Sequence, residues 1–164
     1  MARMPGDVLL IGIAQLAIVV AGFTAISATL LPAGNTWTAA QRIRLRTIVS
    51  TSFNAAFESL LPLIAYPTLA DVRISFVLSS ALVAIYLSAV VGTRTRQIVR
   101  AGALRARATQ LTLSAAAGSI VLFALDALVF GSLTVYALAL CSQLSVAAIS
   151  FYDLVSTATR NDAV

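Results

Sequence analysis

Five long apolar stretches, separated by short polar segments, dominate this sequence of 164 residues. Each is about 20 residues long, the length that a helix needs to cross the roughly 30 Å hydrocarbon core of a bilayer. We place the spans at 8–31, 47–66, 72–91, 109–129 and 133–155. The chain is therefore predicted to be an all-α, polytopic transmembrane helical bundle, a single domain over 1–164 that contacts the lipid bilayer.

The composition indicates lipid rather than water as the solvent. Hydrophobic residues make up 60% of the chain and charged residues 10%. Soluble domains average roughly 45–50% apolar and roughly 25% charged residues. So little charge could not cover the surface of a water-soluble domain of this size.

Residues that stop or start helices mark the limits of the spans. Pro67 is expected to end the second span, and Asp71 to cap the helix of the third. Gly131 and Ser132 supply a very short turn between the fourth and fifth spans. The first run, Val8 to Leu31, exceeds the roughly 7–15 residues of a signal-peptide core, so we interpret it as a retained span.

The basic residues are eleven arginines with no lysine, and they are unevenly distributed between the spans. One side of the predicted bundle carries only Arg3 and Arg73. The other side carries Arg42, Arg44, Arg46, Arg94, Arg96, Arg100, Arg105, Arg107 and Arg160. Basic residues in short loops stay in the cytoplasm, so we expect the N-terminus outside and the C-terminus in the cytoplasm.

Glu58 is the most informative single residue, because it falls near the middle of the second span. A charged side chain is costly at that depth and usually faces protein or a watery cavity. Asn54 lies on the same helical face, and Pro62 cannot donate to the carbonyl of Glu58, which frees a backbone acceptor. These three residues form a candidate ion, proton or ligand site. The alternative is a protonated Glu58 that hydrogen-bonds a neighbouring helix.

Two more acids fall near the ends of spans. Asp126 lies near the outer end of the fourth span and Asp153 near the inner end of the fifth. Both are candidates either for a direct role, with Asp126 as a ligand or ion contact, or for helix capping. They lie at opposite depths and cannot pair, so a relay from Glu58 to either would need Gln15, Gln143 or water.

The arginines at the cytoplasmic side have two interpretations. They could form a surface that docks an anionic lipid headgroup or an acidic partner, or they could only orient the chain. The residues concerned are Arg42, Arg44, Arg46, Arg96, Arg100 and Arg107. A nucleic-acid partner is not expected, because it would require a larger basic surface with interleaved aromatic residues.

The residue types required for common catalytic and metal sites are missing from the sequence. The chain has no histidine, no lysine and a single cysteine, Cys141. An imidazole base, a serine–lysine dyad, a zinc site and a disulfide are therefore excluded. We expect no enzyme activity, no metal and no cofactor.

The segment 15–64 combines Gly22-Phe23 near the end of the first span, Trp37, an arginine-rich entry to the second span at Arg42, and Leu61-Pro62. In these features it resembles a group of small bacterial multi-pass inner-membrane proteins. The resemblance implies a bacterial cytoplasmic membrane and no particular activity.

Three functions follow from these patterns. The leading hypothesis is a non-enzymatic accessory or partner subunit of a membrane complex, because the helices carry faces of small residues and the cytoplasmic side is basic. The alternative is a small transporter or channel subunit that uses Asn54, Glu58 and Pro62, as a homo-oligomer. The third is an intramembrane lipid enzyme, disfavoured because no nucleophile and base can be named together.

Overall fold

The computed structural model describes residues 4–30, 39–100 and 107–161, and these residues form an all-helical bundle without strands. The helices are α1 (Asp7–Leu30), α2 (Ala39–Leu69), α3 (Val72–Arg100), α4 (Arg107–Leu125), the short π-helix η2 (Asp126–Phe130) and α5 (Leu133–Asn161). Five of the described segments are long and apolar enough to cross a membrane, namely Asp7–Ile26, Arg44–Leu69, Val72–Arg96, Thr109–Phe130 and Leu133–Ser156. The prediction of an all-α chain with five helices long and apolar enough to span a membrane is thereby confirmed.

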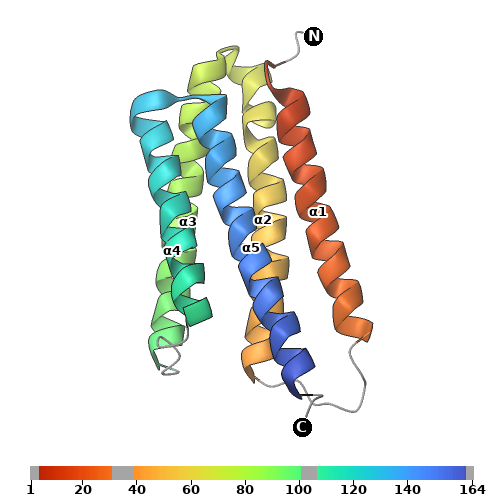
Figure 1. The fold of residues 1–164 in the computed structure, drawn as a ribbon. Helices are drawn as coiled ribbons and strands as arrows, with labels where there is room; N and C mark the ends of the chain where they lie inside the picture. Colours follow the sequence, from red (N-terminus) through yellow and green to blue (C-terminus); the bar gives the residue numbers. More distant parts are fainter. Residues whose placement is uncertain (1–3, 31–38, 101–106, 162–164) are drawn as a thin grey trace.

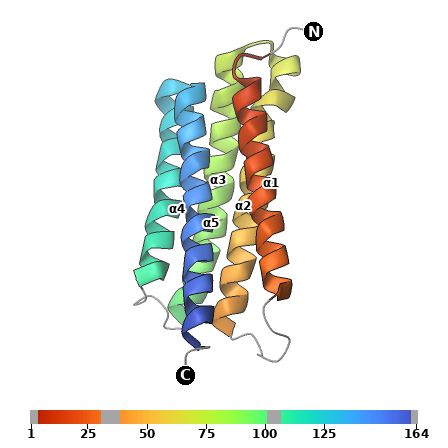
Figure 2. The same cartoon turned by 45° about the vertical axis from the view of Figure 1, so that its right-hand side comes forward.

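Four of the helices form a ring, and α1 packs outside it. Helices α2, α3, α4 and α5 each contact the next, and α5 closes the ring against α2. Helix α1 lies along α2 and touches α5 (Figures 1 and 2). Helix α1 begins and α5 ends at opposite ends of the bundle (Figure 1). A site inside the ring is lined by α2 to α5, because these helices form the ring.

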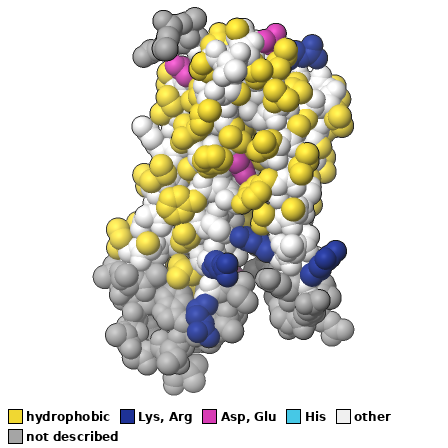
Figure 3. Space-filling view, turned by 180° about the vertical axis from the view of Figure 1, so that it is seen from behind, with side chains coloured by type: hydrophobic (Ala, Val, Ile, Leu, Met, Phe, Trp, Pro, Cys, Tyr) yellow, Lys and Arg dark blue, Asp and Glu magenta, His cyan; other side chains and the backbone are white. Residues whose placement is uncertain are grey.

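Many large apolar side chains of the bundle point outward, while several small polar ones are buried between the helices. Phe53, Phe57 and Leu128 are more than half exposed, whereas Ser52, Ser59 and Ser80 are fully buried. Figure 3 shows hydrophobic side chains over the middle of one face and arginines gathered near the end at which α2 begins and α3 ends. We call the end of the bundle that carries these arginines the basic end. Such a distribution suits a helical bundle in lipid, where small residues allow helices to approach closely.

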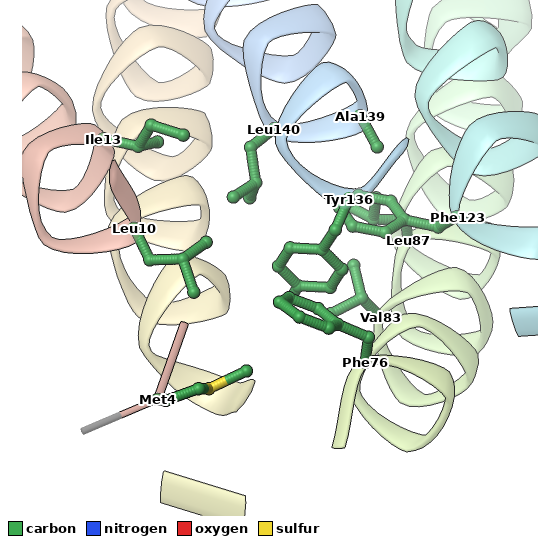
Figure 4. Packing of buried hydrophobic residues seen from close by; sticks show 10 residues of the cluster. All are labelled: Met4, Leu10, Ile13, Phe76, Val83, Leu87, Phe123, Tyr136, Ala139 and Leu140. Carbon is green, nitrogen blue, oxygen red and sulfur yellow. The ribbon is translucent and has the colours of Figure 1, made fainter. Parts of the chain in front are cut away.

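A cluster of apolar side chains fills the bundle toward the end opposite the basic end. Tyr136 lies at its centre, with ring centroids 5.4 Å from Phe76 and 5.2 Å from Phe123. Figure 4 shows these rings with aliphatic side chains of α1, α3 and α5 around them. Its exposed fraction is 0%, so Tyr136 belongs to the interior of the bundle rather than to its surface.

The second span extends further than its prolines suggest. Pro67 was expected to end the helix, and this is wrong, because α2 includes both Pro62 and Pro67 and ends only at Leu69. The chain leaves the helix at Ala70, whose φ of +54° is left-handed. The predicted cap is confirmed, since Asp71 Oδ1 accepts the backbone N–H of Ile74 at 3.0 Å.

The connection between α4 and α5 is a tight hairpin, as Gly131 and Ser132 predicted. Gly131 has a φ of +57° and donates its N–H to the Asp126 carbonyl at 2.7 Å. A Cβ at Gly131 would lie 2.8 Å from Arg73 Cγ and 2.8 Å from Val77 Cγ2. Both the backbone conformation and the close approach of α3 therefore require glycine.

We predict that Gly131→Ala destabilises the bundle by about 2 kcal/mol, because left-handed backbone alone costs about 1–2 kcal/mol for a residue with a Cβ. Unfolding in mixed detergent micelles, followed by circular dichroism, measures the effect. Gly12→Ala is the matched control, since Gly12 is helical and a Cβ there meets nothing within 4 Å. Equal stability of the two variants would contradict this account of the hairpin.

Candidate functional site

Glu58 lies inside the helical ring rather than toward lipid. Its exposed fraction is 3%. The Nε2 group of Gln143, on α5, donates a hydrogen bond to Glu58 Oε2. The other carboxyl oxygen, Oε1, is buried and has no hydrogen-bond partner among the described residues, and the same is true of Gln143 Oε1. Two buried oxygen atoms, one each on α2 and α5, therefore retain hydrogen-bonding capacity.

The backbone carbonyl of Glu58 receives a hydrogen bond from a side chain. Pro62 lacks the N–H that would normally bond this carbonyl in an α-helix. The Tyr136 hydroxyl donates to the Glu58 carbonyl oxygen at 2.6 Å. The acceptor that Pro62 frees is thus satisfied from α5, which joins α2 to α5 through two adjacent hydrogen bonds at Glu58.

Asn54 lies on the same helix as Glu58 but bonds a different neighbour. Its Oδ1 accepts a hydrogen bond from the Tyr86 hydroxyl of α3 at 3.3 Å. Pro62, the third member of the stripe, is fully buried. The stripe of Asn54, Glu58 and Pro62 therefore faces two different helices of the ring, α3 and α5.

A cavity of about 80 Å³ opens next to Asn54 and Gln143, between α2, α3, α4 and α5. Aliphatic side chains, among them Leu87, Leu113 and Val146, line much of it. Its polar lining consists of Thr47, Thr51, Asn54, Arg94, Thr112, Ser119 and Gln143. Gln143 thus both lines this cavity and bonds Glu58. We call it the ring cavity.

Asp126 is a structural residue at the end of the bundle opposite the basic end. It is fully buried, and both carboxyl oxygens have partners. The Ser80 hydroxyl donates to Oδ2 at 2.6 Å, and the Ser132 N–H donates to Oδ1 at 2.8 Å. These bonds hold the α4–α5 hairpin against α3. No described contact joins Asp126 to the carboxyl group of Glu58.

The candidate arginines differ in their surroundings. Arg44 Nε pairs with Asp153 Oδ2 at 2.8 Å, which joins α2 to α5 at the basic end. The side chains of Arg42, Arg46 and Arg96 are exposed there. The side chains of Arg100 and Arg107 lie outside the described residues.

Two contributors to the site were not identified from the sequence. Tyr136 was not considered as a partner of Glu58, although the carbonyl that Pro62 frees requires a donor on another helix. Arg94 was counted only for orientation, yet it lines the ring cavity. The available signal was its position, since Arg94 is the first arginine after the third apolar stretch.

The described residues contain no group of three or more His, Cys, Asp or Glu side chains that could hold a metal ion. Comparison with known proteins adds no assignment, since no family model, curated protein or solved structure matches the chain. The function must therefore be argued from the site. Its chemistry consists of a buried carboxyl group, an amide with spare acceptor capacity and a neighbouring arginine.

We predict that Tyr136→Phe destabilises the bundle by about 1 kcal/mol, because it leaves the Glu58 carbonyl unsatisfied. Pro62→Ala restores a backbone N–H to that carbonyl, so the same tyrosine change should cost measurably less in the Pro62→Ala background. The four unfolding free energies in mixed micelles form a double-mutant cycle. Strictly additive effects would show that the two residues do not share this acceptor.

Proposed function

We propose that this chain is a small membrane transport subunit in which Glu58 carries a proton or a monovalent cation across part of the bilayer. The observation that supports the proposal is the buried Glu58 Oε1, which has no partner among the described residues, beside the equally unsatisfied Gln143 Oε1. A carboxylic acid with a purely structural role is expected to have its buried oxygens bonded. Asp126 in the same bundle meets that expectation, and Glu58 does not.

The position of Glu58 suits such a role. Acidic side chains within spans usually mark ion pathways or proton relays, because water, a proton or a cation must compensate them at that depth. Gln143 joins the carboxyl group to the ring cavity, through which a proton or ion from the basic end can approach it. Tyr136, Phe76 and Phe123 fill the interior on the opposite side. A homo-oligomer is part of the proposal, because five helices rarely enclose a pore alone.

The accessory-subunit hypothesis is retained as a second proposal, supported by the arginines at the basic end. Arg44 is neutralised by Asp153, whereas Arg42, Arg46 and Arg96 are exposed. Exposed guanidinium groups at one end of a bundle suit anionic lipid headgroups or an acidic partner protein. Both proposals assume the orientation in which the basic end is cytoplasmic, as the positive-inside pattern favours. They also assume the bacterial inner membrane, which the resemblance of segment 15–64 implies.

We predict that Glu58→Gln reduces flux through the reconstituted protein to the level of empty vesicles, because the amide can neither release a proton nor neutralise a cation. Flux of H⁺, Na⁺ and K⁺ would be followed with ion-sensitive dyes under an imposed potential. Asp71→Asn is the matched control, since Asp71 is exposed and asparagine also caps helices well. Unchanged flux in Glu58→Gln would remove Glu58 from the mechanism, and no flux of any of these ions would exclude the transport proposal.

We predict for the second proposal that a tagged chain, expressed at native level and purified in mild detergent, brings another membrane protein with it in a fixed ratio. Charge reversal at the exposed arginines, as Arg42→Glu with Arg46→Glu, should remove that protein from the complex. Native mass spectrometry measures both composition and ratio. A homo-oligomer with no second protein would contradict the accessory role and favour transport.

A further inference from the structure

The Arg94 side chain is partly buried between the helices, unlike the exposed side chains of Arg42, Arg46 and Arg96 at the basic end. Its Nη2 group donates to Ser50 Oγ at 2.7 Å. Among the described residues no carboxylate pairs with it, whereas Arg44 pairs with Asp153. Removing a guanidinium from water without a counter-ion is costly. The Arg94 side chain, which lines the ring cavity, is therefore suited to receive an anion.

The charges around Arg94 strengthen this preference. Tyr86 and Arg46 both lie close enough to Arg94 to interact with it electrostatically; the interaction with Tyr86 is favourable, and that with the second cation, Arg46, is unfavourable. The Ser50 hydroxyl donates to the Thr47 carbonyl at 3.2 Å, so it offers Arg94 a lone pair and no negative charge. The potential at this end of the cavity is consequently positive, and an anion there would relieve the repulsion.

The size and walls of the cavity limit the anion. At roughly 10–15 Å³ for each water-sized sphere, a cavity of about 80 Å³ holds about six non-hydrogen atoms. Leu87, Leu113 and Val146 line it with aliphatic groups. A phosphate ion would place additional charged oxygens against these groups, which is unfavourable. A single carboxylate on a short apolar chain matches both the guanidinium and the walls.

Another part of the cavity lining supplies a hydrogen-bond acceptor. Gln143 is 3% exposed, lines the cavity and has no partner for Oε1 among the described residues. Asn54 lines the cavity as well, four residues or about 6 Å along α2 from Ser50, the residue that Arg94 bonds. Glu58, which Gln143 bonds, lies four residues further along α2. A ligand that carries a hydroxyl group within reach of Gln143 would satisfy that oxygen.

We propose that the ring cavity binds a short hydroxylated monocarboxylate. Its carboxylate bonds the Arg94 guanidinium, its hydrocarbon chain contacts Leu87, Leu113 and Val146, and its hydroxyl donates to Gln143 Oε1. This proposal goes beyond ion movement at Glu58, because binding requires only Arg94 and the cavity. Since Gln143 also bonds Glu58, the ligand would contact the side chain that holds the buried carboxyl group.

The test is calorimetric titration of the purified full chain in detergent with sodium 4-hydroxybutyrate. We expect saturable binding that Arg94→Gln weakens about tenfold or more, through loss of a charge-assisted hydrogen bond. Arg94→Lys keeps the cation and should bind better than Arg94→Gln. Arg73→Gln is the matched control, because Arg73 is exposed at the end of α3 opposite Arg94.

A ligand series on the unaltered protein covers the case in which the Arg94 variants do not fold. Butyrate, which lacks the hydroxyl, should bind more weakly, and 1-butanol and inorganic phosphate should not bind. The proposal would be overturned by any of three results: no binding of 4-hydroxybutyrate, equal binding by folded Arg94→Gln, or equal binding of 1-butanol. Ligand binding can be present without Glu58-dependent flux, and that flux can persist without ligand binding. Failure of the binding proposal is therefore distinguishable from failure of the transport proposal.

Discussion

The hydrocarbon interior of a bilayer offers no hydrogen-bond partners, so a spanning chain must satisfy its polar groups from within. This constraint explains why serines such as Ser59 and Ser80 are buried, and why the exposed Ser88 bonds a carbonyl of its own helix. The phenylalanines of α2, which need no such partner, face outward. The constraint also explains the position of Tyr136. Pro62 removes one backbone bond at membrane depth, and the Tyr136 hydroxyl replaces it on the Glu58 carbonyl. That bond, together with the Gln143–Glu58 bond and the Arg44–Asp153 pair, joins α2 to α5.

The same constraint distinguishes the acids of this chain. Asp126 has its oxygens bonded by Ser80 and Ser132, and Asp153 is paired with Arg44. Both therefore contribute to structure, one at each end of the bundle. Glu58 is the acid whose buried oxygen lacks a partner among the described residues. An acidic residue in a span is a functional candidate because of its depth and because its buried oxygens lack hydrogen-bond partners.

Gln143 connects the two features on which the functional proposals rest. Its amide donates to Glu58 and lines the cavity that contains Arg94. The proposed ion chemistry at Glu58 and the proposed anion binding at Arg94 would thus both involve the Gln143 side chain. The aromatic cluster around Tyr136 fills the interior on the far side, so the proposed binding region occupies the basic half of the ring.

The sequence alone determined the helical class, the five spans, the cap at Asp71 and the hairpin at Gly131, because span length, apolar composition and local turn chemistry act within one segment. It also identified Glu58 and the carbonyl that Pro62 frees. The donor to that carbonyl, the Arg44–Asp153 pair and the presence of Arg94 in a cavity were decided only by tertiary structure. These contacts join helices that are far apart in the sequence, and packing decides which helices meet. The spacing of residues along one helix does not encode which helix lies opposite.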